Sequence, residues 1–212
     1  MYPSLSLQSH QGGEIVADIY LVGVGGQGII TASRIIGEAA IVAGKNVLLS
    51  ETHGMAQRGG SVVCTARIGD VSSPLIPDGS ADLLLSFELL ETLRGLCKVS
   101  KRSLVVASNQ RVVPLSVSKQ KLSYPTEDYV LNEARRVASR CVIIDAQKIA
   151  EGAGAPLSSN VVMIGALAGT QVTGLDQKHF ERAIESVIPR HLDKNMSAFR
   201  EGIKAVADAL AG

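Results

Sequence analysis

Three glycines with the spacing G-x-G-x-x-G follow directly after an aliphatic segment. They are Gly23, Gly25 and Gly28, and they separate Tyr20-Leu21-Val22 from a helical pattern that begins at Ile29. The first glycine permits a tight turn, the second lets a ligand approach the backbone, and the third lets helix and strand pack closely. The helix start also offers free N–H groups and a positive dipole end to a phosphate or carboxylate. The spacing therefore predicts an anion-binding turn, with the alternative that the glycines serve only the turn and its packing.

An acidic residue near the second aliphatic segment adds a dinucleotide to the ligands to be considered. Glu51 follows Val47-Leu48-Leu49-Ser50, where dinucleotide-binding folds place the carboxylate that holds a ribose. Two features argue against a simple NAD site: Gln27 puts an amide side chain inside the turn, and Glu51 leads into Thr52-His53-Gly54 instead of a short loop. A free-standing NAD- or flavin-dependent oxidoreductase and a non-enzymatic nucleotide-binding module remain alternative functions.

The segment 51–60 is a polar, glycine-rich loop that is long for an α/β protein. It contains His53 and Arg58, and it ends in Gly59 and Gly60 before the segment 61–68. Regular elements can be connected with fewer residues, so a loop of this kind usually carries function. The backbone geometry just before a strand is the expected reason for the paired glycines.

The elements that position these loops are expected to alternate between strand and helix. The sequence predicts strands at 20–22, 47–49, 61–68, 83–85, 104–106 and 142–144, and helices at 29–39, 88–96 and 127–138. The first two strands with their intervening helix predict a right-handed βαβ unit. We therefore expect an α/β, Rossmann-like fold with a mainly parallel sheet and helices on both faces. The polar segment 114–125 is expected to be a hairpin or a surface excursion.

The C-terminal part is expected to be a helical extension of this fold. The segment 161–169 is apolar on all sides, and Gly165 and Gly169 within it allow another backbone to approach closely. Asp176 is expected to cap a helix, and the apolar repeat from Met196 to Leu210 predicts a core-facing helix, with a partner-binding face as the alternative. Residues 14–212 are expected to form a single domain, preceded by a mobile polar arm over 1–13.

Composition limits the classes of partner and cofactor. The formal net charge is +1, so neither nucleic acid nor a membrane surface is an expected partner. Cys64, Cys97 and Cys141 are isolated from one another, so neither a zinc site nor an iron–sulfur cluster can be assembled from them. Isolated thiols in aliphatic surroundings fit a reducing compartment, and we expect a cytoplasmic protein. The N-terminal residues lack the basic start and apolar stretch of a signal peptide.

The two loops together resemble a known family. Gly23-Val24-Gly25-Gly26-Gln27-Gly28 and Gly54-Met55-Ala56-Gln57-Arg58-Gly59-Gly60 are similar to the gamma-type domain of the thiamine-dependent 2-oxoacid:ferredoxin oxidoreductases. Thr52-His53-Gly54-Met55-Ala56-Gln57 departs from the Tyr-Gly-Pro-Glu of the pyruvate- and oxoglutarate-type members and resembles the indolepyruvate (arylpyruvate) branch. The resemblance covers nearly the whole chain, including Arg67-Ile68-Gly69 and the helical tail.

The resemblance implies an accessory subunit that is inactive alone. A larger partner would bind thiamine diphosphate, magnesium and iron–sulfur clusters, while this chain would hold no cofactor of its own. The complex would convert an arylpyruvate and coenzyme A into an acyl-CoA and carbon dioxide, and would pass two electrons to ferredoxin. Carbanion chemistry belongs to the thiamine ring, so we expect no catalytic residue in this chain.

The same resemblance gives the two loops hypothetical binding roles. The backbone around Gly25 to Gly28 would receive an anion such as a coenzyme A phosphate, and Arg58 would bind a carboxylate or phosphate through two hydrogen bonds. His53 would reach the partner's active site. The alternatives are a local hydrogen bond for His53 and an intersubunit salt bridge for Arg58. The candidate binding residues are Gly23, Gly25, Gly26, Gln27, Gly28, Thr52, His53, Arg58, Gly59 and Gly60.

Overall fold

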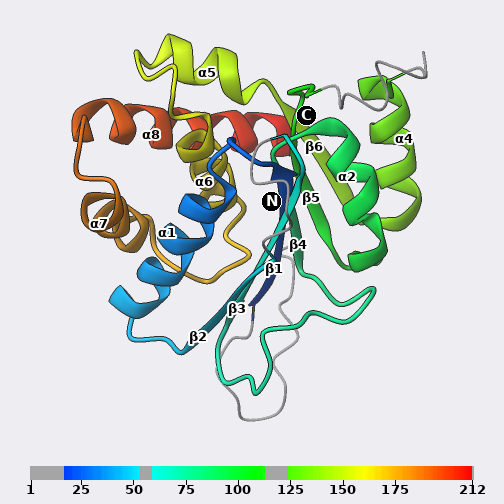
Figure 1. Ribbon diagram of the computed structural model, residues 1–212, viewed down its shortest axis with the longest axis horizontal. Helices are drawn as coiled ribbons and strands as arrows, with labels where there is room; N and C mark the ends of the chain where they lie inside the picture. The colour runs from blue at the N-terminus through cyan, green and yellow to red at the C-terminus, as the bar shows by residue number, and fades with distance from the viewer. Residues whose placement is uncertain (1–16, 53–58, 113–123, 212) are drawn as a thin grey trace.

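The computed structural model describes residues 17–52, 59–112 and 124–211, and contains one six-stranded sheet with helices on both faces (Figure 1). The proposed N-terminal arm and most of the 114–125 segment lie outside the described residues. The elements in chain order are β1 Ala17–Val24, α1 Ile29–Val42, β2 Val47–Thr52, β3 Ser61–Ile68, β4 Leu83–Ser86, α2 Leu89–Gly95, η1 Leu96–Lys98, β5 Leu104–Ser108, α4 Glu127–Val137, β6 Arg140–Ile144, α5 Ala146–Gly152, α6 Ser159–Thr170, α7 Gln177–Val187 and α8 Leu192–Ala211.

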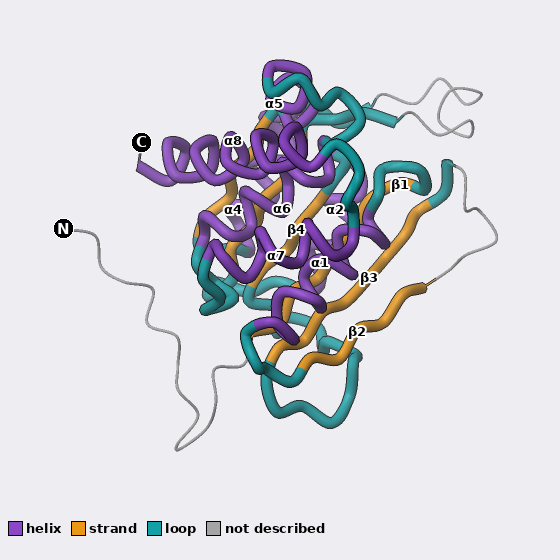
Figure 2. The backbone as a smooth tube through the Cα atoms, turned by 90° about the vertical axis from the view of Figure 1, so that its left-hand side faces the viewer, coloured by secondary structure: helices purple, strands orange, loops and turns teal. Residues whose placement is uncertain are grey.

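The sheet is mainly parallel, as the sequence predicts, but its second strand does not lie beside the first. The strand order is β2-β3-β1-β4-β5-β6. Strands β1, β4, β5 and β6 pair in parallel, whereas β3 pairs antiparallel with both β1 and β2. Figure 2 shows β3 between β1 and β2. Strand β3 returns along β2 and pairs with β1 over its full length, so it lies between the two strands of the predicted βαβ unit.

The two faces of the sheet are covered by different groups of helices. Helices α1, α6, α7 and α8 lie on one side, and α2 and α4 lie on the other (Figure 1). The larger core contains aliphatic side chains of the central strands, such as Ile19, Leu21 and Leu85, together with Ile35 of α1 and Phe180 of α7. The smaller core lies under α4, around Leu84, Val105 and Ala134. Both faces are thus filled mainly by aliphatic residues.

The C-terminal helices confirm the expected extension. Asp176 and His179 form a capping box at the start of α7, and Phe199 and Val206 of α8 are completely buried. Helices α6 and α8 pack closely, with Gly165 and Gly169 of α6 against the backbone or side chains of α8. Within the described residues no helix is both long and apolar enough to cross a membrane.

A polar network joins the amino end of β1, the carboxyl end of β3 and the residue before β4. Arg67 donates from Nε to Asp18 Oδ1 at 2.7 Å and from an Nη to Asp18 Oδ2 at 2.9 Å. The Asp18 amide donates to the Asp82 carboxylate at 2.8 Å, and the Asp82 amide donates to the Asp18 carbonyl at 2.8 Å. Arg67, which belongs to the segment that resembles the oxidoreductase family, therefore stabilises the sheet.

Burial in this network makes the Asp82 carboxylate a source of pH dependence. Burial raises the pKa of Asp82, and the hydrogen bond from the Asp18 amide only partly offsets the rise. A carboxyl whose folded pKa exceeds its unfolded pKa contributes stability below the unfolded pKa and loses it as pH rises through the folded pKa. In urea unfolding, the free energy of unfolding of Asp82→Asn relative to that of the wild type should therefore be higher at pH 7 than at pH 3.5. An equal or reversed difference contradicts this prediction, and Asp208→Asn at an exposed position controls for the loss of one charge.

Candidate functional site

The glycine turn connects the carboxyl end of β1 to the start of α1. Gly26 and Gly28 have φ angles of 107° and 77°, a region that side-chain-bearing residues rarely adopt. A Cβ on Gly23 would lie 2.9 Å from Phe87 Cβ, and one on Gly28 would lie 2.6 Å from Asn160 Nδ2. Backbone conformation therefore requires glycine at Gly26 and Gly28, and close packing requires it at Gly23 and Gly28.

Backbone hydrogen bonds join the glycine turn to the end of the second loop. The Gly25 amide donates to the Gly60 carbonyl at 2.8 Å, and the Gly59 amide donates to the Gly25 carbonyl at 3.3 Å. Ser61, the next residue, donates its hydroxyl proton to Glu91 Oε2 at 2.6 Å. The structure thus brings Gly25, Gly59 and Gly60 together at one edge of the sheet.

Of the other predicted residues of the second loop, only Thr52 is among the described residues. Thr52 ends β2 as an exposed residue opposite Val63. His53 and Arg58 lie outside the described residues, so their roles stay predictions. Because Gly59 and Gly60 are anchored, the loop returns to the sheet directly beside the glycine turn.

The Gln27 side chain forms hydrogen bonds inside the protein. Its Oε1 accepts from the Val24 amide at 2.8 Å, and its Nε2 donates to the Phe87 carbonyl at 2.9 Å and to Gln110 Oε1 at 2.8 Å. Both amide protons are therefore used. In contrast, the backbone amides of Gly26 and Gly28 have no hydrogen-bond acceptor among the described residues. The turn can thus offer backbone donors to an anion while Gln27 holds it in place.

A chain of side-chain amides that the sequence did not indicate extends from Gln27. Gln110 Nε2 donates to Gln147 Oε1 at 3.2 Å, and Gln147 Nε2 donates to the Pro156 carbonyl at 3.1 Å. Gln110 lies just beyond the carboxyl end of β5, and the rule that ligand sites of α/β sheets lie at carboxyl ends would have drawn attention to it. This chain ties the glycine turn to the ends of β4 and β5 and to the loop before α6.

Glu88 is a buried carboxylate that shapes the same edge of the sheet. It accepts hydrogen bonds from the Glu91 amide at 3.0 Å and from the Val112 amide at 3.1 Å. Burial raises its pKa, and these hydrogen bonds lower it in part. Glu88 caps α2 and fixes the chain beyond β5, so its contacts give it a structural role.

Glu51 lies too far from the glycine turn to bind the ribose of a dinucleotide held at that turn. It lies on the edge strand β2, and β3 separates β2 from β1. Neighbouring strands are about 4.8 Å apart, so β2 and β1 are separated by roughly 10 Å. The Glu51 carboxylate lies 3.9 Å from Arg34 of α1. This arrangement differs from that of a dinucleotide-binding fold, in which the acidic residue ends the strand adjacent to the first.

The described residues contain no group of three or more His, Cys, Asp or Glu placed to hold a metal ion. Burial raises the pKa of the Cys64 thiol to about 12 and that of Cys141 to about 11. Both thiols are therefore protonated at neutral pH and behave as small apolar side chains.

Comparisons with known proteins agree with the two-loop pattern. The family model described as "Pyruvate ferredoxin/flavodoxin oxidoreductase" matches residues 18–205. "Indolepyruvate oxidoreductase subunit IorB" of Archaeoglobus fulgidus is 44% identical over 87% of this chain and 92% of its own length. The protein of the same name from Methanothermobacter thermautotrophicus is 43% identical over 91% of this chain and 98% of its own length.

Solved structures share the fold at lower identity. The gamma subunit of a keto/oxoacid ferredoxin oxidoreductase from Geobacter sulfurreducens superimposes with a TM-score of 0.67 at 23% identity, over 91% of this chain and 99% of that one. The 2-oxoglutarate:ferredoxin oxidoreductase from Magnetococcus marinus gives a TM-score of 0.69 at 19% identity, over 91% of this chain and 31% of that one. A stand-alone subunit and a section of a longer chain thus share this architecture.

Proposed function

Because the chain belongs to the pyruvate ferredoxin/flavodoxin oxidoreductase family, we propose that it is the accessory subunit of an enzyme that oxidises indolepyruvate or related arylpyruvates. Its similarity to indolepyruvate oxidoreductase subunits at 43–44% identity supports this substrate class. Residues 14–212 act as a single domain in this proposal, in the cytoplasm. The observation that carries it is the hydrogen bonding of the two glycine loops through Gly25 and Gly60.

A larger partner subunit binds thiamine diphosphate, magnesium and iron–sulfur clusters, and passes two electrons per turnover to ferredoxin. Bound thiamine supplies the carbanion chemistry that releases carbon dioxide from the 2-oxoacid. Coenzyme A accepts the acyl group. The present chain positions coenzyme A for reaction on that partner and stabilises the negative charge of its phosphates.

The glycine turn and Arg58 are the proposed contacts to coenzyme A. The amides of Gly26 and Gly28 face no acceptor among the described residues, and the positive end of the α1 dipole favours an anion there. Gly23 and Gln27 hold the turn, while Thr52, His53, Gly59 and Gly60 belong to the adjoining loop. Arg58 adds a charged, bidentate donor for a phosphate.

The arrangement favours this function over an NAD-dependent oxidoreductase. The carboxylate of Glu51 stands on a strand that β3 separates from the glycine turn. Saturating NAD should therefore leave the thermal unfolding midpoint unchanged, whereas an NAD-binding protein gains a few kcal/mol of stability at ligand concentrations about 100 times the Kd.

Co-expression with the thiamine-binding partner tests the proposal directly. We expect indolepyruvate- and coenzyme A-dependent ferredoxin reduction only when both subunits are present.

Arg58→Ala should raise the KM for coenzyme A about tenfold, since it removes a charge-assisted hydrogen bond. Arg182→Ala, at an exposed position on α7, should leave it unchanged. Normal kinetics of an intact Arg58→Ala complex would sink the role of Arg58, and activity of the partner alone would sink the proposed function.

A further inference from the structure

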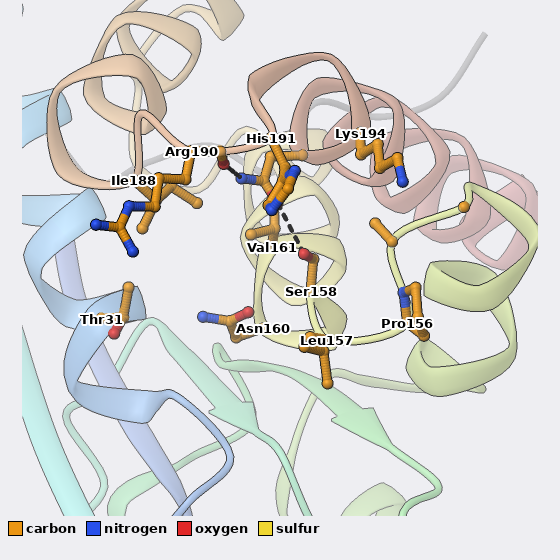
Figure 3. Close-up of a pocket in the computed structure, with 13 residues that line it drawn as sticks. Thr31, Pro156, Leu157, Ser158, Asn160, Val161, Ile188, Arg190, His191 and Lys194 are labelled. Carbon is orange, nitrogen blue, oxygen red and sulfur yellow. Dashed lines mark hydrogen bonds between the residues drawn. The ribbon is translucent and has the colours of Figure 1, made fainter.

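A pocket of about 450 Å³ lies beside α1, and its lining residue Asn160 contacts Gly28 of the glycine turn. Its walls come from Thr31 of α1, the segment 154–158 before α6, Asn160 and Val161 of α6, and the connection from α7 to α8. Figure 3 shows the side chains of these elements around one open space. The volume lies within the range of about 300–1,000 Å³ that is usual for small-molecule sites.

The wall between α6 and α8 is held by hydrogen bonds. The Ser158 hydroxyl donates to Asn195 Oδ1 at 2.7 Å, and Asn195 Nδ2 donates to the Arg190 carbonyl at 3.0 Å (Figure 3). Asn195 is buried. The carbonyl of His191 accepts from the amides of Lys194 and Asn195 at the start of α8, so the connection that carries Arg190 and His191 is joined to the first turn of the helix that carries Lys194.

The pocket has a basic lining. Arg190, His191 and Lys194 are among its residues, and no acidic side chain is. None of these three basic side chains forms an ion pair with an acid in the part of the chain that the structure describes. Figure 3 shows the Arg190 guanidinium directed toward Thr31, and the Asn160 amide facing the same space. These groups can surround an anion with a charge and two polar contacts.

The rest of the lining is mainly apolar, and part of it is exposed. Leu157 is 95% exposed although it is a large hydrophobic residue, Pro156 beside it is also exposed, and the partly buried Ile188 and the buried Val161 complete the apolar lining. An inorganic anion alone would leave this surface in water. A ligand that carries an apolar body would bury it and gain about 25 cal/mol for each Å² removed from water.

We propose that this pocket binds a small organic anion, with its phosphate or carboxylate at Arg190, Asn160 and Thr31 and its apolar body against Leu157 and Pro156. The pocket adjoins the glycine turn through Asn160, so the inference goes beyond the anion site of the proposed function by adding residues of α6 and of the segment 188–195. The charged head can belong to a phosphate ester or to an arylcarboxylate, because both present oxygen acceptors on an apolar framework.

Calorimetric titration of the full chain with phenyl phosphate, phenylacetate, inorganic phosphate and benzyl alcohol tests the proposal. Phenyl phosphate and phenylacetate should both bind at least tenfold more tightly than the neutral alcohol, and the tighter of the two identifies the preferred head group. Arg190→Gln should weaken anion binding about tenfold, as expected for the loss of one charge-assisted hydrogen bond. Leu157→Asn should weaken phenyl phosphate binding but leave inorganic phosphate binding unchanged.

Lys204→Gln is the matched control, because it removes an exposed positive charge from α8 outside the pocket. It should leave every Kd unchanged. The proposal is overturned if benzyl alcohol binds as tightly as the anions, if none of the probes binds, or if Arg190→Gln and Lys204→Gln have equal effects. The titration uses no partner subunit, so its failure is distinguishable from failure of the proposed complex.

Discussion

Replacing Gly202 with alanine should lower the free energy of unfolding by about 3 kcal/mol, at the upper end of what overpacking usually costs. A Cβ on Gly202 would meet the Val162 carbonyl of α6 far inside van der Waals contact, and one on Gly165 would meet the Phe199 carbonyl of α8 in the same way. Both obstacles are backbone atoms, which cannot rotate away. Helices α6 and α8 must therefore separate, and the buried Phe199 side chain must repack.

Thermal unfolding measures this effect. For a chain of this size 1 kcal/mol corresponds to roughly 2–4 °C, so Gly202→Ala should lower the Tm by about 6–12 °C. Gly165→Ala should act similarly. The double variant should cost less than the two single variants together, because the first substitution already separates the helices.

Gly152→Ala is the control for the general effect of replacing a helical glycine. Gly152 is exposed at the end of α5, and a Cβ there would meet no atom within 4 Å. That substitution should be neutral or slightly stabilising, by up to about 1 kcal/mol. Equal changes for Gly152→Ala and Gly202→Ala would show that helix packing is not the cause.

The close packing of these helices is a part of the fold that the sequence predicts well. An apolar stretch with glycines four residues apart leaves little choice other than a buried helix approached by another backbone. The central strands could be predicted equally well, because Leu83, Val105 and their neighbours form unbroken aliphatic runs typical of strands covered on both faces. These features depend on residues close together in the chain.

The direction of β3 could not be predicted from the sequence in the same way. Side chains alternate between faces in both parallel and antiparallel strands, so the residues 61–68 carry no local mark of their pairing. The orientation is decided when β3 bonds to β1 and β2 at once. The position of Glu51 relative to the turn depends on that pairing, which explains why a dinucleotide site remained an open alternative.

In the candidate site, too, some features follow from local sequence and others depend on contacts between distant residues. The glycine spacing predicts the turn, and the two φ angles above 70° agree with it. The partners of Gln27 could not be predicted, since Phe87 and Gln110 lie 60 and 83 residues away. The contact of Asn160 with Gly28 and the basic pocket beside it likewise depend on how α6 packs against α1.

Gly28→Ala should lower kcat/KM for coenzyme A on the order of 100-fold in the complex with the partner subunit. The new methyl group would lie 2.6 Å from Asn160 Nδ2, and the residue would have to keep a φ angle of 77°. The turn must shift to relieve both, and a displacement of about 1 Å in a positioning element can cost a factor of 100 in rate. Steady-state assays at varied coenzyme A measure the loss, with binding of the partner checked by gel filtration.

Gly44→Ala separates backbone strain from the contact with Asn160. Gly44 has a φ angle of 71°, but a Cβ there would meet no atom within 4 Å. It lies beyond the opposite end of α1, so its substitution should cost roughly 1–2 kcal/mol of stability with coenzyme A kinetics unchanged. Combining Gly28→Ala with Asn160→Ala should recover part of the lost kcat/KM, because the steric conflict is removed while the backbone strain remains. If an assembled Gly28→Ala complex keeps wild-type coenzyme A kinetics, the turn serves only the packing of β1 and α1, and the anion must bind elsewhere.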